Sequence, residues 1–250
     1  GAYWEPSSDG ILSQCINTVA FDPDDAHIAY AAVATGSNSA RRVALGTKIG
    51  LYKSTDGGRT WSHKLLLCNE RSVGRLIAFG RKNEAGVRPV FTAASNAAGY
   101  EGDARGTTGL WRSCDQGETW ECIGLEDRSI ISIYTDPDLD LLIVASDRGL
   151  DVSYDNGETF ASANSNLPYQ SASAVAVDPE NKEHWTIGAR VELANGWCGG
   201  MLYETYDSGA SWSEVNGELY GRYETTYITS LDYAYVDGHE TPRLFMAVYR

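Results

Sequence analysis

The chain has 250 residues, which is long enough to bury a substantial core within one domain. Its 34 acidic residues outnumber its 20 basic ones and give a formal net charge of −14, so nucleic acid, a polyanion, is not expected as a partner. No apolar run approaches the roughly 20 residues that a membrane-spanning helix needs, and the 26 Gly, 15 Tyr and 7 Trp favour short strands joined by tight turns over helices.

The first complete group of predicted strands follows a short N-terminal segment, residues 1–12. Two apolar runs, Thr18–Phe21 and Ile28–Val33, lie on either side of Asp22-Pro23 and predict two strands joined by a turn. A long loop, residues 35–49, leads to a third apolar run, Gly50–Lys53, and a tight turn then leads to a fourth strand. The order is therefore strand, turn, strand, loop, strand, turn, strand.

This order recurs along the rest of the chain. Asp136-Pro137 and Asp178-Pro179 stand in the first turn of later units as Asp22-Pro23 does in the first, whereas two other units lack Asp-Pro. No segment shows helical periodicity over three turns. The predicted units span residues 16–67, 73–124, 129–164 and 172–216, and residues 226–250 supply only a first and a second strand.

Each of the four full units carries one eight-residue motif of the form Ser/Thr-x-Asp-x-Gly-x-Thr/Ser-aromatic. It reads STDGGRTW, SCDQGETW, SYDNGETF and TYDSGASW, beginning at residues 54, 113, 153 and 205, so that 59, 40 and 52 residues separate successive motifs. Four strands in a unit of roughly 40–50 residues are typical of a propeller blade. The sequence therefore predicts an all-β fold, a β-propeller of four-stranded antiparallel blades with four full blades and a split or truncated fifth.

Each recurring motif position has a structural reason. The Asp carboxylate can accept backbone N–H groups within a tight turn, the Gly supplies a positive φ, the second hydroxyl closes the loop, and the aromatic ring buries a large apolar area. We therefore predict structural roles for all of these residues, as we do for Asp22, Asp136 and Asp178. The motif residues are Asp56, Gly58, Trp61, Asp115, Gly117, Trp120, Asp155, Gly157, Phe160, Asp207, Gly209 and Trp212.

The two ends of the chain resemble parts of one unit. Gly1–Trp4 is typical of a third strand and Ser8-Asp9-Gly10 is a degraded motif, whereas residues 226–250 stop after a second strand. Either residues 226–250 and 1–12 together complete a fifth blade, which would hide sheet edges, or the chain is cut from a larger propeller. The abrupt ends slightly favour the second interpretation.

Cysteine and histidine give no sign of a metal or a cofactor. The 5 cysteines are an odd number without CxxC spacing, and the 4 histidines are scattered over the units without a His/Asp cluster, so we predict no metal site and no cofactor. Cys114 and Cys122 lie on either side of a predicted hairpin turn, where a local disulfide is one alternative.

The four motifs and the strands before them resemble those of the Asp-box (BNR-repeat) propellers. That superfamily includes sialidases, xyloglucan-cleaving endoglucanases, sortilin-type receptor domains and photosystem assembly factors. Gly1–Trp4, Tyr30–Val33, Gly50–Asp56 and Gly109–Ser113 are similar to the first blades of inverting xyloglucanases. The resemblance implies the propeller scaffold.

The resemblance does not carry over a catalytic residue. In xyloglucanases of this type one catalytic Asp stands just before the Gly-Ala-Tyr segment, where this sequence has no residue, and the second lies in a later propeller domain that has no match here. Sialidases carry an Arg-Ile-Pro segment, and this chain contains none.

What differs between the units is a candidate for function. The loops between second and third strands and those between units are long and unequal, and they leave from the face opposite the motif turns. Aromatic rings stack on the apolar faces of sugars, while carboxylates and arginines bind their hydroxyl edges. The predicted ligand-binding residues in these loops are Tyr100, Glu101, Asp103, Glu192, Trp197, Arg222 and Tyr223.

The function we expect is that of an extracellular or secreted binding or scaffold module that recognises a protein or a glycan through this loop face. One alternative is a glycoside hydrolase of the xyloglucanase type, or a fragment of one, for which Glu101, Asp103, Glu192 and Glu224 are eligible carboxylates. Another is an assembly factor, which would carry a basic or apolar docking patch.

Overall fold

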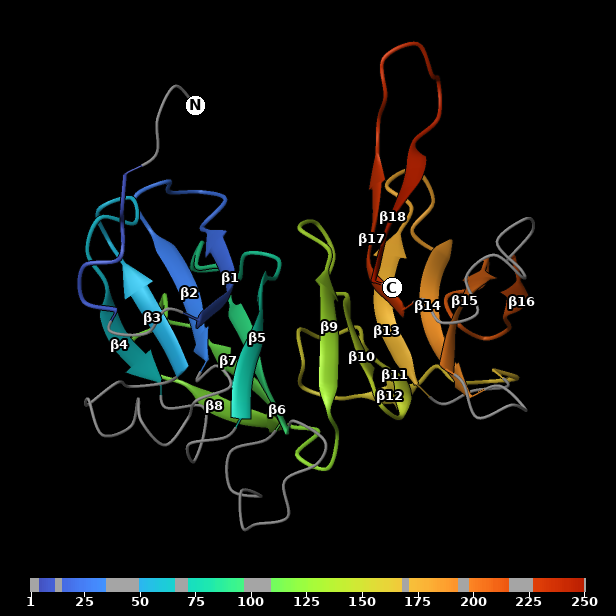
Figure 1. Ribbon diagram of the computed structural model, residues 1–250, viewed down its shortest axis with the longest axis horizontal. Helices are drawn as coiled ribbons and strands as arrows, with labels where there is room; N and C mark the ends of the chain where they lie inside the picture. Colours follow the sequence, from blue (N-terminus) through green and yellow to red (C-terminus); the bar gives the residue numbers. More distant parts are fainter. Residues whose placement is uncertain are drawn as a thin grey trace. The chain divides into compact units, whose positions relative to one another are not determined.

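A computed structural model describes residues 5–11, 15–34, 50–65, 72–96, 109–167, 171–192, 198–215 and 227–249 (Figure 1). The regular secondary structure in these ranges consists of β-strands joined by turns. The prediction of an all-β fold is thereby confirmed. No helix within these ranges is long and apolar enough to cross a membrane.

The chain divides into two compact units, and the first comprises Gly1–Ile130 with Thr135–Asp140. It contains two antiparallel sheets of four strands each, in the order of the sequence. Sheet 1 consists of β1 (Cys15–Phe21), β2 (Ala29–Ala34), β3 (Gly50–Ser54) and β4 (Ser62–Leu65). Sheet 2 consists of β5 (Ser72–Phe79), β6 (Val90–Asn96), β7 (Gly109–Ser113) and β8 (Glu121–Gly124).

The second unit comprises Ile131–Tyr134 with Leu141–Arg250 and contains two more four-stranded sheets and a hairpin. Sheet 3 consists of β9 (Ile130–Thr135), β10 (Leu142–Ser146), β11 (Gly149–Ser153) and β12 (Ala161–Ser162). Sheet 4 consists of β13 (Ala172–Val177), β14 (Trp185–Glu192), β15 (Cys198–Thr205) and β16 (Ser213–Glu214). The hairpin pairs β17 (Tyr227–Ala234) with β18 (Arg243–Tyr249).

The strand register places the two kinds of turn at the same end of each sheet. In sheet 1, Ala29 pairs with Phe21 at the end of β1 and with Ser54 at the end of β3. In sheet 4, Trp185 pairs in the same way with Val177 and Thr205. The first turn and the motif turn of a sheet therefore meet at one end, here called the turn end, and the loops between second and third strands leave from the opposite end, the loop end.

The second strand of each sheet lies at its centre and is buried on both faces. Every residue of β10 is buried, and Tyr30, Phe91 and Trp185 are fully inaccessible. Alternating apolar and polar residues would suit a half-exposed sheet, but these strands are almost continuously apolar because both faces are covered.

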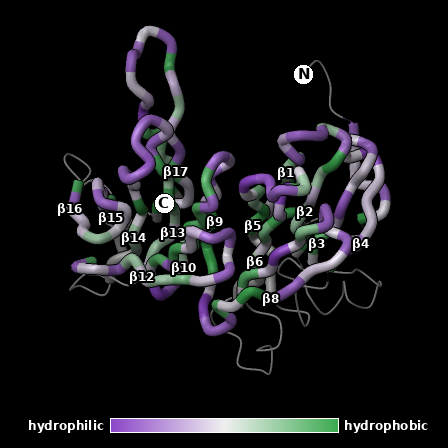
Figure 2. Tube along the Cα trace, turned by 180° about the vertical axis from the view of Figure 1, so that it is seen from behind, coloured by the Kyte–Doolittle hydropathy of each residue, from purple (hydrophilic) through white to green (hydrophobic). Residues whose placement is uncertain are grey.

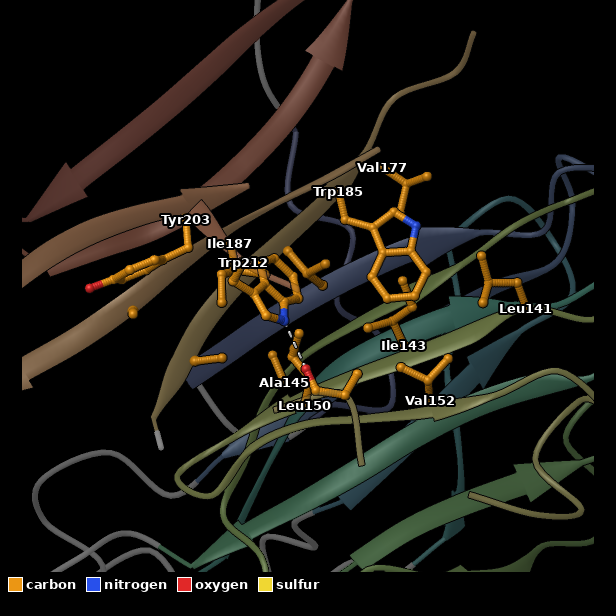
Figure 3. Close-up of a cluster of buried hydrophobic side chains, with 14 residues drawn as sticks. Leu141, Ile143, Ala145, Leu150, Val152, Val177, Trp185, Ile187, Tyr203 and Trp212 are labelled. Atoms are coloured by element: carbon orange, nitrogen blue, oxygen red, sulfur yellow. Dashed lines mark hydrogen bonds between the residues drawn. The ribbon is translucent and has the colours of Figure 1, made fainter. Parts of the chain in front are cut away.

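A core cluster of 14 buried residues lies in the second unit, between sheets 3 and 4 (Figure 3). The Trp185 and Trp212 rings lie 6.5 Å apart at an interplanar angle of 55°. The indole N–H of Trp212 donates to the carbonyl oxygen of Ala163 at 2.9 Å, so the one polar atom of this buried ring is satisfied. A corresponding cluster in the first unit surrounds Tyr30 and Leu51.

The N-terminal segment lies against the motif turn of sheet 1. The backbone N–H of Trp61 donates to the carbonyl oxygen of Asp9 at 2.8 Å, and its indole N–H donates to that of Ser7 at 3.0 Å. The side chain of Ile11 is buried in a cluster with Tyr52. The predicted pairing of residues 1–12 with 226–250 stays a prediction, and residues 1–4 lie outside the described ranges.

Candidate functional site

In each of the four motif turns, the polar side chains form hydrogen bonds within the turn itself. In sheet 1 the hydroxyl of Ser54 donates to Asp56 Oδ1 and accepts the N–H of Gly58, while Asp56 accepts the N–H and the hydroxyl of Thr60. The same four hydrogen bonds recur in the other three turns, and all sixteen measure between 2.5 and 2.9 Å. Both carboxylate oxygens of each motif Asp are thus occupied within its own turn.

These hydrogen bonds make the motif carboxyls stronger acids. Donation by the Ser153 hydroxyl, then by the hydroxyl and N–H of Thr159, lowers the pKa of Asp155 to about 2. Donation by Ser211 and Thr205 has the same effect on the pKa of Asp207, which is also about 2. A carboxyl that is ionised throughout the neutral range is poorly suited to act as a general acid.

The first turns of sheets 1, 3 and 4 are each closed by their own Asp residue in a similar way. Asp136 Oδ1 accepts the backbone N–H groups of Asp138 and Leu139 at 2.9 and 3.0 Å, as in an Asx turn. The two turns of a sheet are also joined, because the N–H of Gly57 donates to the carbonyl oxygen of His27 at 2.8 Å. In sheet 4 the N–H of Ser208 donates in the same way to the carbonyl oxygen of Glu183 at 3.1 Å, so the turn ends of sheets 1 and 4 are closed hydrogen-bonded structures.

The loop end is where the sheets differ. The strand pairs that border it are Val33 with Gly50, Ala94 with Gly109, and Glu192 with Cys198. Glu192 is the last residue of β14, so its backbone lies at this end. The other predicted ligand-binding residues lie outside the described residues: Tyr100, Glu101, Asp103, Trp197, Arg222 and Tyr223.

Sheet 3 has the shortest connection between its second and third strands, and the side chain of Asn164 occupies the space over this connection. The side-chain oxygen of Asn164 accepts the N–H of Leu150 at 2.7 Å, and its amide donates to the carbonyl oxygen of Arg148 at 3.2 Å. A Cβ atom on Gly149 would lie 2.1 Å from Asn164 Oδ1. Asn164 therefore fills the space over this connection.

One buried carboxylate, that of Asp151, was not identified from the sequence. Asp151 pairs with Val144 in sheet 3, at the position that Tyr52 takes opposite Ala31 in sheet 1 and Tyr203 takes opposite Ile187 in sheet 4. Asp151 is only 4% exposed to solvent. The signal was present in the repeats, because Gly-Leu-Tyr and Gly-Leu-Trp in the first two units become Gly-Leu-Asp in the third.

A second feature that the sequence did not reveal surrounds His184, at the turn end of sheet 4. Its Nδ1 lies 3.0 Å from Asp178 Oδ2, and its ring stacks on Tyr206 at 4.2 Å. Its Nε2 lies 3.5 Å from the hydroxyl of Tyr233 in the hairpin. The sequence pattern showed no His/Asp cluster, but His184 lies beside Asp178, six positions before it, and Tyr233 reaches the same imidazole from 49 positions away.

The His184 cluster fastens the hairpin to sheet 4. The Tyr233 hydroxyl shares a hydrogen bond of 2.7 Å with Thr186. Burial, followed by the nearby carboxylates of Glu204 and Asp178, raises the pKa of Tyr233 to about 12, so the phenol is neutral at physiological pH. Burial opposes ionisation of Asp178, but the N–H of Glu180 and the His184 imidazole outweigh it and hold the pKa of Asp178 below its ordinary value.

Neither metal ligands nor a disulfide are found in the described ranges. No group of three or more His, Cys, Asp or Glu residues there could hold a metal ion. Cys114 and Cys122 are both exposed and are not joined by a disulfide, so the alternative of a local disulfide between them is wrong. Burial raises the pKa of the Cys122 thiol, which disfavours a reactive thiolate.

Comparison with known proteins gives matches at the level of structure. No protein-family model matches the chain, and no curated protein sequence does. A GH74 enzyme of Niastella koreensis superposes with a TM-score of 0.60 at 17% identity, covering 86% of this chain and 33% of that one. An ancestral GH74 enzyme gives 0.70 at 14% identity, covering 95% and 30%. The GH74 xyloglucanase of Xanthomonas campestris gives 0.56 at 18% identity, covering 83% and 32%.

The chain spans about a third of the length of these three enzymes. A GH93 α-L-arabinofuranosidase of Fusarium graminearum is also similar, with a TM-score of 0.51 at 12% identity, covering 92% of this chain and 73% of that one. Identities this low show the fold alone, which is all-β, propeller-like and built from four-stranded antiparallel sheets.

Proposed function

We propose that the chain is an Asp-box β-propeller module that binds a polysaccharide through the loop ends of its sheets. The observation that carries this proposal is that the two ends of the sheets differ: the motif side chains are hydrogen-bonded to one another at the turn end, whereas the long variable connections lie at the loop end. All four motif carboxylates are hydrogen-bonded within their turns at the turn end. The long connections, residues 35–49, 97–108 and 193–197, join strands at the loop end.

The class of ligand follows from the fold likeness and from the loop composition. The similar structures include a xyloglucanase and an α-L-arabinofuranosidase, whose names refer to glycans. The predicted loop residues combine rings (Tyr100, Trp197, Tyr223) with charged groups (Glu101, Asp103, Glu192, Arg222). Rings stack on the apolar faces of pyranose units, and charged groups bind hydroxyls at the edges. A polysaccharide therefore fits better than a protein, and it suits the predicted extracellular location.

A binding experiment tests the proposal. The chain is titrated with xyloglucan, arabinan and an unrelated β-glucan in a calorimeter, and Trp197→Ala and Tyr100→Ala are measured beside it. Loss of one stacking ring should weaken binding about tenfold, the factor that 1.4 kcal/mol gives. Tyr154→Ala is the matched control, because Tyr154 is 61% exposed but lies in a motif turn at the opposite end of its sheet.

The outcomes separate the alternatives. Affinity that survives Tyr154→Ala and Asp155→Asn but drops in the two loop variants supports binding at the loop ends. If the motif-turn variants stay folded and lose binding while the loop variants keep it, the assignment of the face is wrong. Binding to none of the polysaccharides would instead favour a protein partner.

A glycoside hydrolase is the second candidate, and the fold likeness to GH74 enzymes, with TM-scores from 0.56 to 0.70, favours it. Inverting hydrolysis needs two carboxyl groups about 6.5–9.5 Å apart. The eligible loop carboxylates remain Glu101, Asp103, Glu192 and Glu224. Release of reducing sugar from xyloglucan by the chain, abolished by a Gln or Asn at one of these positions, would establish catalysis. Binding without release would leave the non-catalytic proposal.

A further inference from the structure

Three tyrosine side chains at the turn end of the second unit are strongly exposed. Tyr154, Tyr206 and Tyr235 are each 61% exposed, and together they are here called the tyrosine surface. Tyr154 and Tyr206 occupy the second position of their motifs, where the first two motifs have Thr55 and Cys114. The motif turn closes with the same hydrogen bonds in all four cases. Closure of the turn therefore does not account for an aromatic ring at this position.

The ring of Tyr206 is held in place from one side. The His184 imidazole stacks on it with ring centroids 4.2 Å apart and an interplanar angle of 6°. His184 is itself fixed by Asp178, whose Oδ2 lies 3.0 Å from its Nδ1. The Tyr206 hydroxyl donates to Glu204 Oε2 at 3.3 Å. A ring that is backed and oriented in this way loses little conformational freedom when a ligand contacts it.

The other two rings come from neighbouring elements. The hairpin β17–β18 extends beyond sheet 4 (Figure 1), and the connection at its tip, residues 235–242, is largely hydrophilic (Figure 2). The Tyr235 hydroxyl in this connection donates to Glu180 Oε1 in the first turn of sheet 4 at 3.1 Å. The Tyr154 hydroxyl of sheet 3 is hydrogen-bonded to Ser208 in the motif turn of sheet 4. Sheet 3, sheet 4 and the hairpin thus each contribute one ring to the turn end of sheet 4.

Carboxylates surround these rings. The first turn of sheet 4 and the start of its motif, residues 178–184 and 204–207, carry five carboxylates and one lysine. Partial burial, followed by the charge of Glu204, raises the pKa of Tyr206 above its ordinary value. Partial burial and the hydrogen bond to Glu180 do the same to the pKa of Tyr235. Both phenols are therefore neutral at physiological pH, and both lie in a negative electrostatic field.

We propose that the tyrosine surface binds an arginine side chain of a partner protein. A guanidinium group stacks on a neutral aromatic ring and also forms paired hydrogen bonds with a carboxylate, and this surface offers both next to each other. A neutral sugar would gain little from the negative field, so charge complementarity favours a cationic peptide segment over a second glycan. Tyrosine and arginine are also enriched at protein interfaces. This site is independent of the polysaccharide proposal, because it lies at the opposite end of the sheets.

Fluorescence anisotropy of a labelled peptide of alternating arginine and serine residues, added to the full chain, tests the proposal. Tyr206→Thr, which introduces the residue type of the first motif, should weaken binding about fivefold by removing the stacking contact. Tyr206→Phe keeps the ring and should keep most of the affinity. Glu180→Gln should weaken binding, whereas its matched control Glu84→Gln, an exposed carboxylate in the first turn of sheet 2, should not.

Two altered peptides test the ligand itself. Lysine in place of arginine should bind more weakly, because a compact ammonium group does not stack on a ring as a planar guanidinium does. Citrulline in place of arginine keeps the planar shape without the charge, and this peptide should not bind.

Several outcomes would overturn the proposal. Absence of binding is one, and equal losses in Glu84→Gln and Glu180→Gln are another, because the net charge of −14 alone would then attract the peptide. If Tyr206→Phe binds as weakly as Tyr206→Thr, or lysine binds as well as arginine, the ring is not the contact. Polysaccharide affinity should be unchanged in Tyr206→Thr, and peptide affinity should be unchanged in Trp197→Ala. Failure of either proposal therefore leaves the other one standing.

Discussion

At the scale of single residues, the motif turns are organised by a buried hydroxyl rather than by the more conspicuous carboxylate. Ser113 is 1% exposed, and its oxygen accepts the N–H of Gly117 at 2.7 Å while its proton goes to Asp115 at 2.8 Å. The carboxylate of Asp115 lies at the surface, where water can replace some of its contacts. The hydroxyl is the group whose loss leaves a buried donor without a partner.

We therefore predict that Ser113→Ala lowers the free energy of unfolding by about 1–3 kcal/mol, the cost of leaving a buried N–H unsatisfied. Ser113→Thr should keep most of the stability, because Thr205 fills the same position in the fourth motif turn with its hydroxyl 2.9 Å from the Gly209 nitrogen. Urea unfolding followed by tryptophan fluorescence measures both. Equal stability of the Ala and Thr variants would contradict this account.

The motif glycine has a second requirement besides its backbone conformation. Gly117 has φ of +82°, and a Cβ there would lie 2.6 Å from the ring of Tyr30, whose hydroxyl donates to the carbonyl of Gln116 at 2.6 Å. Gly238, in the hairpin tip, has a similar φ of +85° with nothing within 4 Å. The two glycines therefore separate backbone strain from close packing.

Gly238→Ala should cost about 1 kcal/mol, the penalty of a left-handed conformation for a residue with a Cβ. Gly117→Ala should cost about 2–4 kcal/mol, because the ring of Tyr30 must also move. Denaturant midpoints of the two variants give the comparison. If the two losses are the same, the approach of Tyr30 contributes nothing to the requirement for glycine.

At the scale of elements, the sheets are held together by large side chains from their second strands and by the motif aromatics. Trp185 is 0% exposed and its indole N–H donates to the carbonyl of Lys182 at 2.7 Å. Figure 3 shows it between residues of β10 and β13, with Trp212 beside it. A ring that bridges two sheets makes the stability of each depend on the other.

Trp185→Ala is accordingly expected to cost about 3–5 kcal/mol, the range for removal of a buried large ring. Phe245→Ala is the control in the same unit, and a ring that is 52% exposed should cost below about 1 kcal/mol. Chemical unfolding monitored by far-ultraviolet circular dichroism suits both variants. A small loss for Trp185→Ala would show that sheets 3 and 4 are stabilised independently.

At the scale of the whole molecule, the acidic composition has two opposite effects on stability. A net charge of −14 destabilises the compact state by self-repulsion at neutral pH. The motif carboxylates act in the other direction, because hydrogen bonds lower the pKa of Asp115, Asp155 and Asp207 from 3.8 to about 2. Arg88 and Lys82 lower the pKa of Asp24 to about 2 as well.

A carboxyl with a lower pKa in the folded state stabilises the protein above its unfolded pKa and loses that contribution as pH falls through the folded one. We predict that the urea midpoint drops between pH 4 and pH 2, where the unfolded chain binds more protons. Asp155→Asn should reduce this drop, because it removes one of the carboxyls whose pKa the fold lowers. A midpoint that stays constant from pH 4 to pH 2.5 would rule the mechanism out.

The all-β class and the four-stranded antiparallel sheets could be predicted from the sequence because their signals are local. Asp155 and Thr159 lie four positions apart, so the contact between them depends mainly on the local sequence and little on the rest of the fold. The predicted ligand-binding residues remain predictions, since all but the backbone of Glu192 fall outside the described residues. Loop conformation depends on contacts with other loops, which no local pattern encodes.

The sequence by itself determined which segments form strands and how each motif turn closes, since these depend on neighbours within a few residues. The tertiary structure alone decided that His184 meets Tyr233, that Asp151 is buried where other sheets have an aromatic ring, and that one face of β18 stays exposed. These features depend on how strands that are distant in the sequence pack against one another. Packing between strands, rather than the preference of any one strand, fixes them.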